Sequence, residues 1–275
     1  MTPSVSIVVP TWNRRKFVPL LLRHFERQSY PHEDMELIIA DDGDDPIEDL
    51  LTASRYYSAD KKKNSPIRYY RFGRKITQGA KRNFLNEQAR GEYIITMDDD
   101  DWYGPDYVSS IVTTLDSTDK LICGSSGINC YFPQLNSIFA LGPYGANHTC
   151  THFMAYRRAY LANHRFDDKK NDSPEPDITN NFTEPMAQVS GSERFFLLIT
   201  HPGNTMNRLR LLTQGGLRID LEQKMVGVTP RYTELHGRNR PLATITGLRL
   251  KDVVTDPVAR HFYEKLQELY EPRET

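Results

Sequence analysis

The sequence predicts an α/β protein with a mostly parallel sheet flanked by helices, and three observations support this prediction. Short apolar runs typical of strands recur at residues 5–9, 36–40, 67–72 and 93–97. Segments with apolar residues at helical spacing separate most of these runs, which is the alternation that parallel strands with crossover helices require. Three of the four runs end in polar residues. Because the carboxyl ends of parallel strands share one edge of a sheet, ligands of such proteins bind at that edge.

The elements follow in a regular order through the first half of the chain. The first strand is rich in β-branched residues and leads into a polar loop, and a helix face from Phe17 to Phe25 comes next. The second strand is followed by Asp41 and Asp42, and the third by a helix at about residues 78–89. The fourth strand, residues 93–97, precedes a helix with apolar residues at positions 108, 111, 112 and 115.

Four adjacent carboxylates, Asp98 to Asp101, follow the fourth strand. Like charges at this spacing repel one another, so the run requires a bound cation or neighbouring basic groups. Carboxylate oxygens suit Mg²⁺ or Mn²⁺, which complete their coordination shell with phosphate oxygens. A solvated acidic turn is the alternative explanation, because charge runs are usually exposed to water.

The second half is less regular. It predicts strands at residues 120–132, 137–141 and 224–235, and a strand with a short helix at residues 151–161. Residues 165–185 are rich in Asp, Asn, Pro and Lys, which predicts a mobile loop or lid. A helix is predicted from Glu193 to residue 199, with Ser192 as its cap. Neither repeats nor linkers divide the chain into independent domains.

Composition narrows the function classes. A formal net charge of −1 provides no generally basic surface, so we expect no nucleic-acid partner. Apolar runs are too short for a transmembrane segment. The 3 cysteines lack metal-site spacing and indicate reduced thiols. We therefore expect a cytoplasmic protein, free or peripheral to a membrane.

Four motifs lie between residues 5 and 101. They are V-S-I-V-V-P-T-W-N-R, E-L-I-I-A-D-D-G, G-A-K-R-N and G-E-Y-I-I-T-M-D-D-D-D. Their order and spacing resemble those of family 2 glycosyltransferases with the GT-A fold, a match more specific than any single motif. The resemblance implies a metal-dependent, inverting transfer of sugar from a nucleotide-diphosphate sugar, in particular a UDP-sugar, to a hydroxyl of a glycan or other acceptor. It implies Mn²⁺ or Mg²⁺ as cofactor.

The resemblance also implies a division of the chain. Residues 1–118 would form the donor-binding half, residues 119–245 the acceptor-binding and catalytic half of the same domain, and residues 246–275 a C-terminal helical segment. Pro10, Thr11 and Asn13 match the loop that walls the base pocket. Asp42 matches the acid that accepts a hydrogen bond from the base ring.

Other matched residues would face the diphosphate and the metal. Lys81 and Arg82 would supply positive charge to the base or diphosphate. Asp98 would face the ribose and Asp100 would coordinate the metal, with Asp99 between them. A one-residue shift within the acidic run remains open.

Three further positions have competing interpretations. Glu193 matches the general base that inversion requires; if it matches the preceding acid instead, Arg194 replaces the base and activity is lost. His236 matches a late histidine that completes the metal site, although a lone histidine is often structural; His148, His152 and His201 are further candidates. Trp102 would stack on the donor sugar or cover the core.

Two other functions compete with glycosyl transfer. A sugar-phosphate nucleotidyltransferase uses a similar sheet and acidic metal site, but it usually has a glycine-rich loop after its first strand, and P-T-W-N-R-R contains no glycine. A nucleotide-sugar-binding protein that has lost catalysis is the non-enzymatic alternative. Substitution of Glu193 distinguishes it from a transferase.

Overall fold

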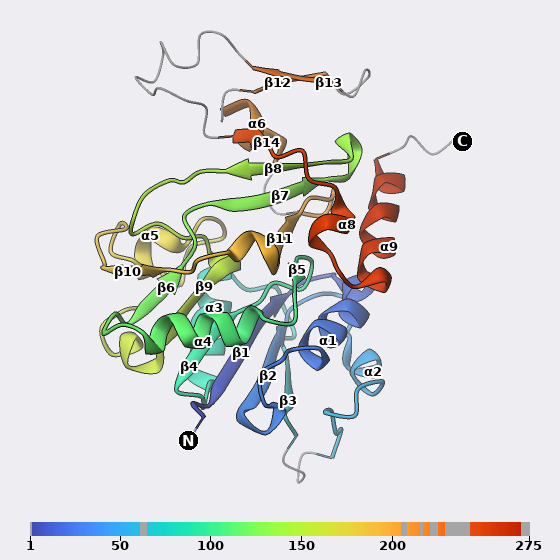
Figure 1. The fold of residues 1–275 in the computed structure, drawn as a ribbon. Coiled ribbons are helices and arrows are strands. Elements are labelled where there is room, and N and C mark those ends of the chain that lie inside the picture. Colours follow the sequence, from blue (N-terminus) through green and yellow to red (C-terminus); the bar gives the residue numbers. More distant parts are fainter. Residues whose placement is uncertain are drawn as a thin grey trace. The chain divides into compact units, whose positions relative to one another are not determined.

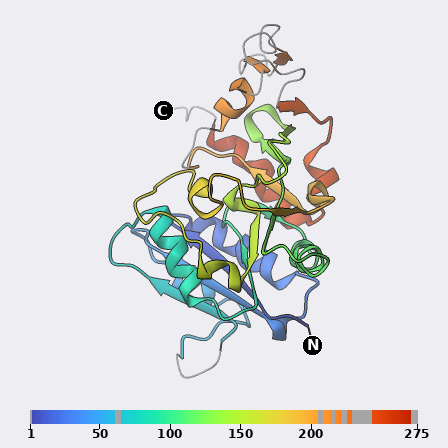
Figure 2. The same cartoon turned by 90° about the vertical axis from the view of Figure 1, so that its left-hand side faces the viewer.

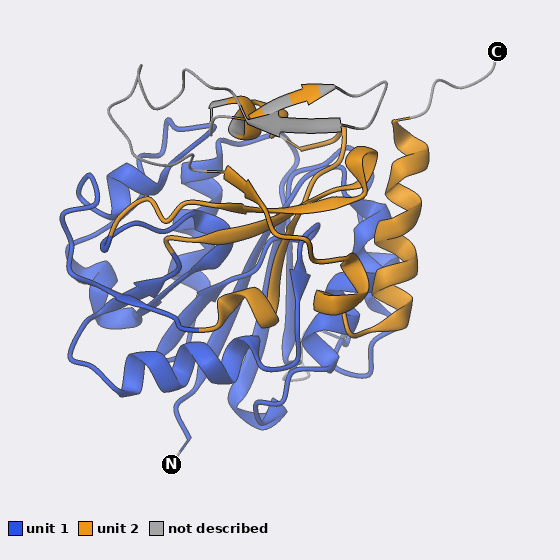
Figure 3. Cartoon of the chain, turned by 45° about the horizontal axis from the view of Figure 1, so that its top comes forward, with its two compact units in different colours: residues 1–125, 146–190 blue, residues 126–145, 191–275 orange. Residues whose placement is uncertain are grey.

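The structure is a computed structural model that describes residues 2–60, 65–204, 208–214, 217–220, 225–228 and 243–270 (Figure 1). The chain forms two compact units (Figure 3). Unit 1 comprises Met1–Ser125 and Ala146–Ser190, and unit 2 comprises Ser126–Gly145 and Gly191–Thr275. The units therefore do not follow the boundaries expected after residues 118 and 245. The division into donor-binding and acceptor-binding segments concerns function and stays a prediction.

Within the described residues, unit 1 contains a sheet of seven strands in the order β10-β6-β9-β4-β1-β2-β3. The strands are β1 (Val5–Thr11), β2 (Met35–Asp41), β3 (Ile67–Arg71), β4 (Tyr93–Thr96), β6 (Ile122–Gly124), β9 (Met154–Arg157) and β10 (Met186–Gln188). All neighbouring strands are parallel except that β9 runs antiparallel to β4 and β6. This arrangement confirms the predicted mostly parallel sheet.

The central strand β1 explains why the apolar runs become strands. Val5 pairs with Met35 on β2 and with Tyr93 on β4, so β1 has a parallel partner on each side. All seven residues of β1 are buried. A continuous apolar run without polar alternation is typical of a strand that is covered on both faces.

Helices cover both faces of this sheet. Figures 1 and 2 show α1 and α4 on one face and α3 on the other. Thr77 caps α3, because its side-chain oxygen accepts a hydrogen bond from Ala80 N at 3.3 Å. The remaining elements of unit 1 are short. The helices of unit 1 are α1 (Val18–Glu26), α2 (Glu48–Leu51), α3 (Gln78–Gln88), α4 (Tyr107–Asp116) and α5 (Glu175–Ile178), with 3₁₀ turns η1 (Arg15–Phe17), η2 (His32–Asp34), η4 (Thr151–Phe153) and η5 (Arg158–Ala162) and the short strand β5 (Trp102–Tyr103).

One apolar cluster joins α3, the sheet and the later part of unit 1. Leu85 of α3 packs with strand residues such as Ile38 and Ile94, and all three side chains are fully buried. Phe166 and Ile178 belong to the same cluster. Phe166 and Ile178 thus anchor the segment 165–185 in the core, and the segment contains α5, whereas its predicted mobility stays a prediction.

Unit 2 contains strands in the order β14-β8-β7-β11 and a separate β12-β13 pair. Its strands are β7 (Ile128–Phe132), β8 (Ser137–Leu141), β11 (Phe196–Ile199), β12 (Leu217–Asp220), β13 (Met225–Val228) and β14 (Ala243–Ile245). Its helices are α6 (Leu209–Gln214), α8 (Leu250–Val253) and α9 (Pro257–Lys265), with 3₁₀ turns η3 (Pro133–Leu135), η6 (Ser192–Arg194) and η7 (Leu266–Leu269). No helix within the described ranges has the length and apolar character needed to cross a membrane.

Two secondary-structure predictions are wrong. The helix expected from Glu193 to residue 199 is a 3₁₀ turn followed by β11, whose four residues are all buried and which runs parallel to β7. A short apolar run without a polar face fits a buried strand as well as a helix, so periodicity could not decide. The strand expected over residues 120–132 is two strands, β6 and β7, which belong to different sheets.

Candidate active site

The candidate site lies where the strand order of unit 1 reverses. The chain passes from β1 to β2 and β3 on one side, then returns to place β4 on the other side of β1. Such a reversal opens a crevice at the carboxyl ends of the two strands, where ligands of open α/β sheets bind. Thr11 ends β1, and Asp98 to Asp101 follow β4. The Thr11 hydroxyl donates a hydrogen bond to Asp99, so the two strand ends meet.

A buried ion pair connects the ends of β1 and β2. The Lys81 ammonium on α3 donates to the Asp42 carboxylate and to the Thr11 carbonyl, the latter at 3.1 Å. Ile76 N donates to the other Asp42 oxygen at 2.8 Å. The side chains of Lys81 and Asp42 are 2% and 0% exposed. Burial lowers the pKa of Lys81, although Asp42 opposes this effect. Because both Asp42 oxygens are occupied within the protein, its expected contact with a base stays a prediction.

Asn13 connects the loops that follow β1 and β2. Its side-chain oxygen accepts from Asp44 N at 2.7 Å, and its amide donates to the Asp44 carboxylate at 3.1 Å. Asn13 has a φ of 54°, a left-handed conformation that Asn tolerates. A Cβ at Gly43 would lie 2.6 Å from Asn13 N, so the close approach of the loops requires glycine there. Pro10 is buried within β1.

Two arginines offset the repulsion within the acidic run. Arg14 lies 3.8 Å from the Asp99 carboxylate and 3.4 Å from that of Asp100, and Arg82 donates to Asp98 at 3.1 Å. Asp99 and Asp100 are each only 5% exposed, so the run is not a solvated turn. Burial, and then the negative charge of Asp100, raise the pKa of Asp99 well above its usual value, while Arg14 acts in the opposite direction.

Three side chains form a group that could hold a metal ion. Asp98, Asp101 and His152 each offer one ligand atom, and these atoms lie within 4.8 Å of one another. His152 joins the acids because it precedes β9, which pairs with β4. The Tyr103 hydroxyl accepts from Asp98 N at 2.8 Å and donates to His152 O at 2.9 Å, which fixes the two ligands relative to each other. Carboxylate oxygen with imidazole nitrogen suits Mn²⁺.

This group differs from the expected metal pair. Asp100 forms an ion pair with Arg14 in the structure, and His236 lies outside the described residues. The assignment of Asp100 and His236 to the metal therefore stays a prediction. His152 appeared in the sequence only as one of several candidate histidines, because its position 51 residues beyond Asp101 carries no local signal.

Arg82 and Trp102 occupy buried positions beside the acidic run. Two nitrogens of Arg82, Nε and Nη1, have no hydrogen-bond partner among the described residues. Burial alone would lower the pKa of Arg82, but Asp98 and Glu175 outweigh it and raise the pKa above its ordinary value. Trp102 is 2% exposed and meets His24 edge-on, with ring centroids 5.0 Å apart. The structure therefore places its indole in the core, and contact with a donor sugar stays a prediction.

Glu193 lies on the exposed surface of η6 in unit 2. The turn begins at Gly191, whose φ of 71° lies in the left-handed region that residues with a side chain rarely adopt. Glycine is therefore required for this turn. The carboxylate is accessible, and its role as general base stays a prediction.

The sequence model described as "Glycosyl transferase family 2" matches residues 6–165, more than half of the chain. Among curated proteins, the chain is 33% identical over 128 residues to the putative glycosyltransferase EpsH of Bacillus subtilis. It is 26% identical over 126 residues to the poly(ribitol-phosphate) β-N-acetylglucosaminyltransferase TarS of Staphylococcus aureus. These matches cover 44% and 45% of the chain but only 33% of EpsH and 21% of TarS.

Solved structures confirm the predicted fold class. S. aureus TarS 1–349 in complex with UDP-GlcNAc has a TM-score of 0.56 at 17% identity, over 73% of this chain and 60% of that one. Mannosyltransferase PcManGT from Pyrobaculum calidifontis, in complex with GDP-Man and Mn²⁺, has a TM-score of 0.58 at 14% identity, over 78% of this chain and 62% of that one. The mixed sheets flanked by helices are thus those of the GT-A fold.

Proposed function

The chain belongs to glycosyl transferase family 2, as its four motifs predicted, and on this premise we propose that it is an inverting, metal-dependent glycosyltransferase. It would move a sugar from a nucleotide-diphosphate sugar to a hydroxyl group of a glycan. One observation carries the proposal: Asp98, Asp101 and His152 converge beside Arg82 at the strand-order reversal. That crevice is where an α/β sheet binds a nucleotide.

We assign the metal, Mn²⁺ or Mg²⁺, to Asp98, Asp101 and His152. The carboxylate oxygens fit either ion, whereas the imidazole nitrogen favours Mn²⁺ over Mg²⁺, and the ligand atoms lie close enough to share one ion. Arg82 holds one oxygen of Asp98, while the other lies 3.6 Å from His152 Nε2. When bound, the cation would neutralise the diphosphate that leaves the sugar.

Arg82 is the residue that we expect to hold the diphosphate. Its ion pair with Asp98 fixes the guanidinium, and two of its nitrogens retain donors without a hydrogen-bond partner among the described residues. Charge-assisted hydrogen bonds from a fixed, buried guanidinium stabilise developing negative charge more strongly than solvated groups do.

We propose a UDP-sugar as the donor. TarS resembles this chain in both sequence and structure, and one of its structures holds UDP-GlcNAc. PcManGT, which resembles it in structure, holds GDP-Man. Direct titration with both nucleotides therefore decides which nucleobase the donor site accepts.

Inversion requires a base on the face of the sugar opposite the leaving group, and we assign this role to Glu193. Its exposed carboxylate is available to accept the proton of an acceptor hydroxyl. Replacement by the isosteric amide removes the proton acceptor without changing the size of the side chain.

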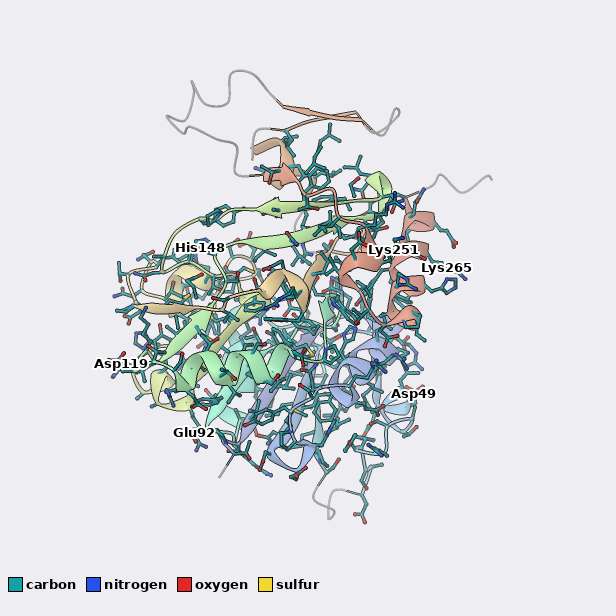
Figure 4. The ribbon with its side chains drawn as sticks, viewed as in Figure 1. Asp49, Glu92, Asp119, His148, Lys251 and Lys265 are labelled. Carbon is teal, nitrogen blue, oxygen red and sulfur yellow. The ribbon has the colours of Figure 1, made fainter. Side chains whose placement is uncertain are left out.

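Calorimetric titration of UDP, GDP and their sugar conjugates, with and without Mn²⁺, tests the donor site. We expect Mn²⁺-dependent binding of a UDP-sugar to weaken at least about tenfold, the equivalent of about 1.4 kcal/mol, in Asp98→Asn and Asp101→Asn. Asp119→Asn is the matched control, because Asp119 is an exposed acid at the surface of unit 1 (Figure 4).

Three results would contradict parts of the proposal. If Asp100→Ala abolishes Mn²⁺-dependent binding while Asp101→Asn does not, the metal lies at the position that the motif alone suggested. If GDP-sugars bind more tightly than UDP-sugars, the assignment of a UDP-sugar as the donor is wrong. If no nucleotide binds with or without metal, the transferase proposal fails.

Glu193→Gln separates an enzyme from a protein that only binds nucleotide-sugars. In a transferase, donor affinity should stay within about twofold of the wild type while turnover falls by about 10²–10⁴-fold, the usual contribution of a general base. Turnover should be measured as release of nucleoside diphosphate. Unchanged turnover in the variant would exclude Glu193 as the base, and absence of turnover in the wild type with intact donor binding would favour the non-catalytic alternative.

A further inference from the structure

A recess of about 560 Å³ opens in unit 1. Residues 165–169 form one wall, and residues 176, 177, 180 and 181 form the other. Its volume lies within the range of roughly 300–1,000 Å³ that is typical of small-molecule sites. None of the roles assigned above uses these residues.

The first wall is held against α3. Asn83 donates to the Phe166 carbonyl at 2.8 Å and to the Asp168 carboxylate at 2.7 Å, and it accepts from Phe166 N at 3.0 Å. Gly79 N donates to the Lys170 carbonyl at 3.0 Å. A Cβ at Gly79 would clash with the backbone of this wall, so the close packing requires glycine. The wall is therefore already formed before any ligand arrives.

The second wall is fixed equally well. Ile178 is fully buried in the same apolar cluster as Phe166, and its carbonyl accepts from the Tyr160 hydroxyl at 2.8 Å. Asn180 and Asn181 have φ values of 48° and 54°. Asparagine tolerates this left-handed conformation. Both asparagines are exposed, so their amides offer donors and acceptors to the recess.

An acid lines the second wall of the recess. Asp177 is only partly buried, so its carboxylate can accept a hydrogen bond from a ligand hydroxyl. Pro176 beside it offers an apolar surface.

The charges that line the recess disfavour an anionic ligand. Arg165 pairs with Asp168 at 2.9 Å, so these two charges cancel. Of the other charged residues in the lining, Asp167 and Asp177 are negative and Lys169 is positive, so the recess carries a net charge of −1 (two acids and one base). A phosphate or carboxylate would be repelled, whereas a neutral polyhydroxyl ligand would find carboxylate and amide partners.

Two connections link the walls of the recess to elements that carry the candidate metal group. Asn83, which holds the first wall, follows Arg82 directly on α3. Glu175, which precedes the second wall, accepts hydrogen bonds from the backbone and hydroxyl of Thr151, at 2.9 and 3.1 Å. Thr151 is the neighbour of His152. The walls are therefore fixed to the same elements that carry the donor-site residues.

We propose that this recess binds an uncharged saccharide, namely the part of the glycan acceptor that does not react. The acceptor role rests on the proposed glycosyltransferase function. The binding of a neutral saccharide follows from the recess itself.

Saturation-transfer NMR and titration with glucose, N-acetylglucosamine and cellobiose test the proposal, with glucose 6-phosphate as the anionic comparison. Asp177→Ala removes the carboxylate acceptor of the recess, and Asn181→Gly removes an amide while keeping the positive φ without strain. Each variant should weaken binding of the neutral probes about tenfold, whereas Asp172→Ala should have no effect. Asp172 is an exposed acid of the same segment that does not line the recess.

Several outcomes overturn the proposal: no neutral probe binds the wild type, glucose 6-phosphate binds more tightly than glucose, or both variants bind like the wild type. Donor titration on the same samples distinguishes the two proposals. If the wild type binds no nucleotide-sugar, the proposed function is refuted. If the wild type binds the nucleotide-sugar but no saccharide, only the proposed saccharide site in the recess is refuted.

Discussion

Lys81→Met tests how much the buried ion pair contributes to unit 1. The substitution keeps the length of the side chain but leaves the Asp42 carboxylate, which is 0% exposed, without its counter-charge. It also removes the hydrogen bond to the Thr11 carbonyl. Breaking a buried pair in this way costs about 3–5 kcal/mol, because one charge stays desolvated and uncompensated. That is a large fraction of the roughly 5–15 kcal/mol by which a domain is stable.

Urea unfolding followed by tryptophan fluorescence measures this cost. Both tryptophans, Trp12 and Trp102, lie in unit 1, so the signal reports the unit that contains the ion pair. Lys170→Met, at an exposed lysine of the same unit, is the control and should change the free energy of unfolding by less than about 0.5 kcal/mol.

A double-mutant cycle shows whether the two charges act together. Asp42→Asn should relieve part of the cost of Lys81→Met, since the double variant buries no charge. We expect the double variant to be about 2–3 kcal/mol more stable than the sum of the single effects. If Lys81→Met costs less than about 1 kcal/mol, or if the two single effects simply add, the pair is not the stabilising contact that its burial indicates.

Three further predictions concern packing and titration. Gly79→Ala places a methyl group against the backbone of the facing wall and should cost about 1–3 kcal/mol in urea unfolding, whereas Gly73→Ala, with no described atom within 4 Å of the new carbon, should be nearly neutral. Burial lowers the pKa of His148 below its unfolded value of about 6.5. The unfolded state therefore binds more protons just below that pH, so the His148 contribution to stability is complete above it and declines as the pH falls. His148→Phe should flatten the pH dependence of the unfolding free energy as the pH falls through and below about 6.5, and an unchanged slope would contradict the assignment. Burial raises the pKa of the Cys123 and Cys150 thiols, so both should react with a thiol reagent slowly in the native protein and rapidly after unfolding; reaction at the rate of a free thiol would show that they are accessible.

The sequence by itself determined the first half of the architecture and the family. The apolar runs of unit 1 became β1 to β4 because a strand buried on both faces requires a continuous apolar stretch, and that signal is local. The order of the four motifs identified the family for the same reason, since each motif is a short segment. The acidic run after β4 also lies where the pattern placed it, at the carboxyl edge beside β1.

Only the tertiary structure decided which side chains meet. His152 reaches Asp98 because β9 pairs antiparallel with β4, a pairing between segments about 60 residues apart that no local pattern encodes. Asp42 accepts a hydrogen bond from Lys81, and this contact depends on how α3 packs on the sheet. The recess likewise exists because residues 165–170 fold back onto α3. Local sequence specifies hydrophobic period and turn chemistry, whereas contacts between distant segments are set by the packing of whole elements.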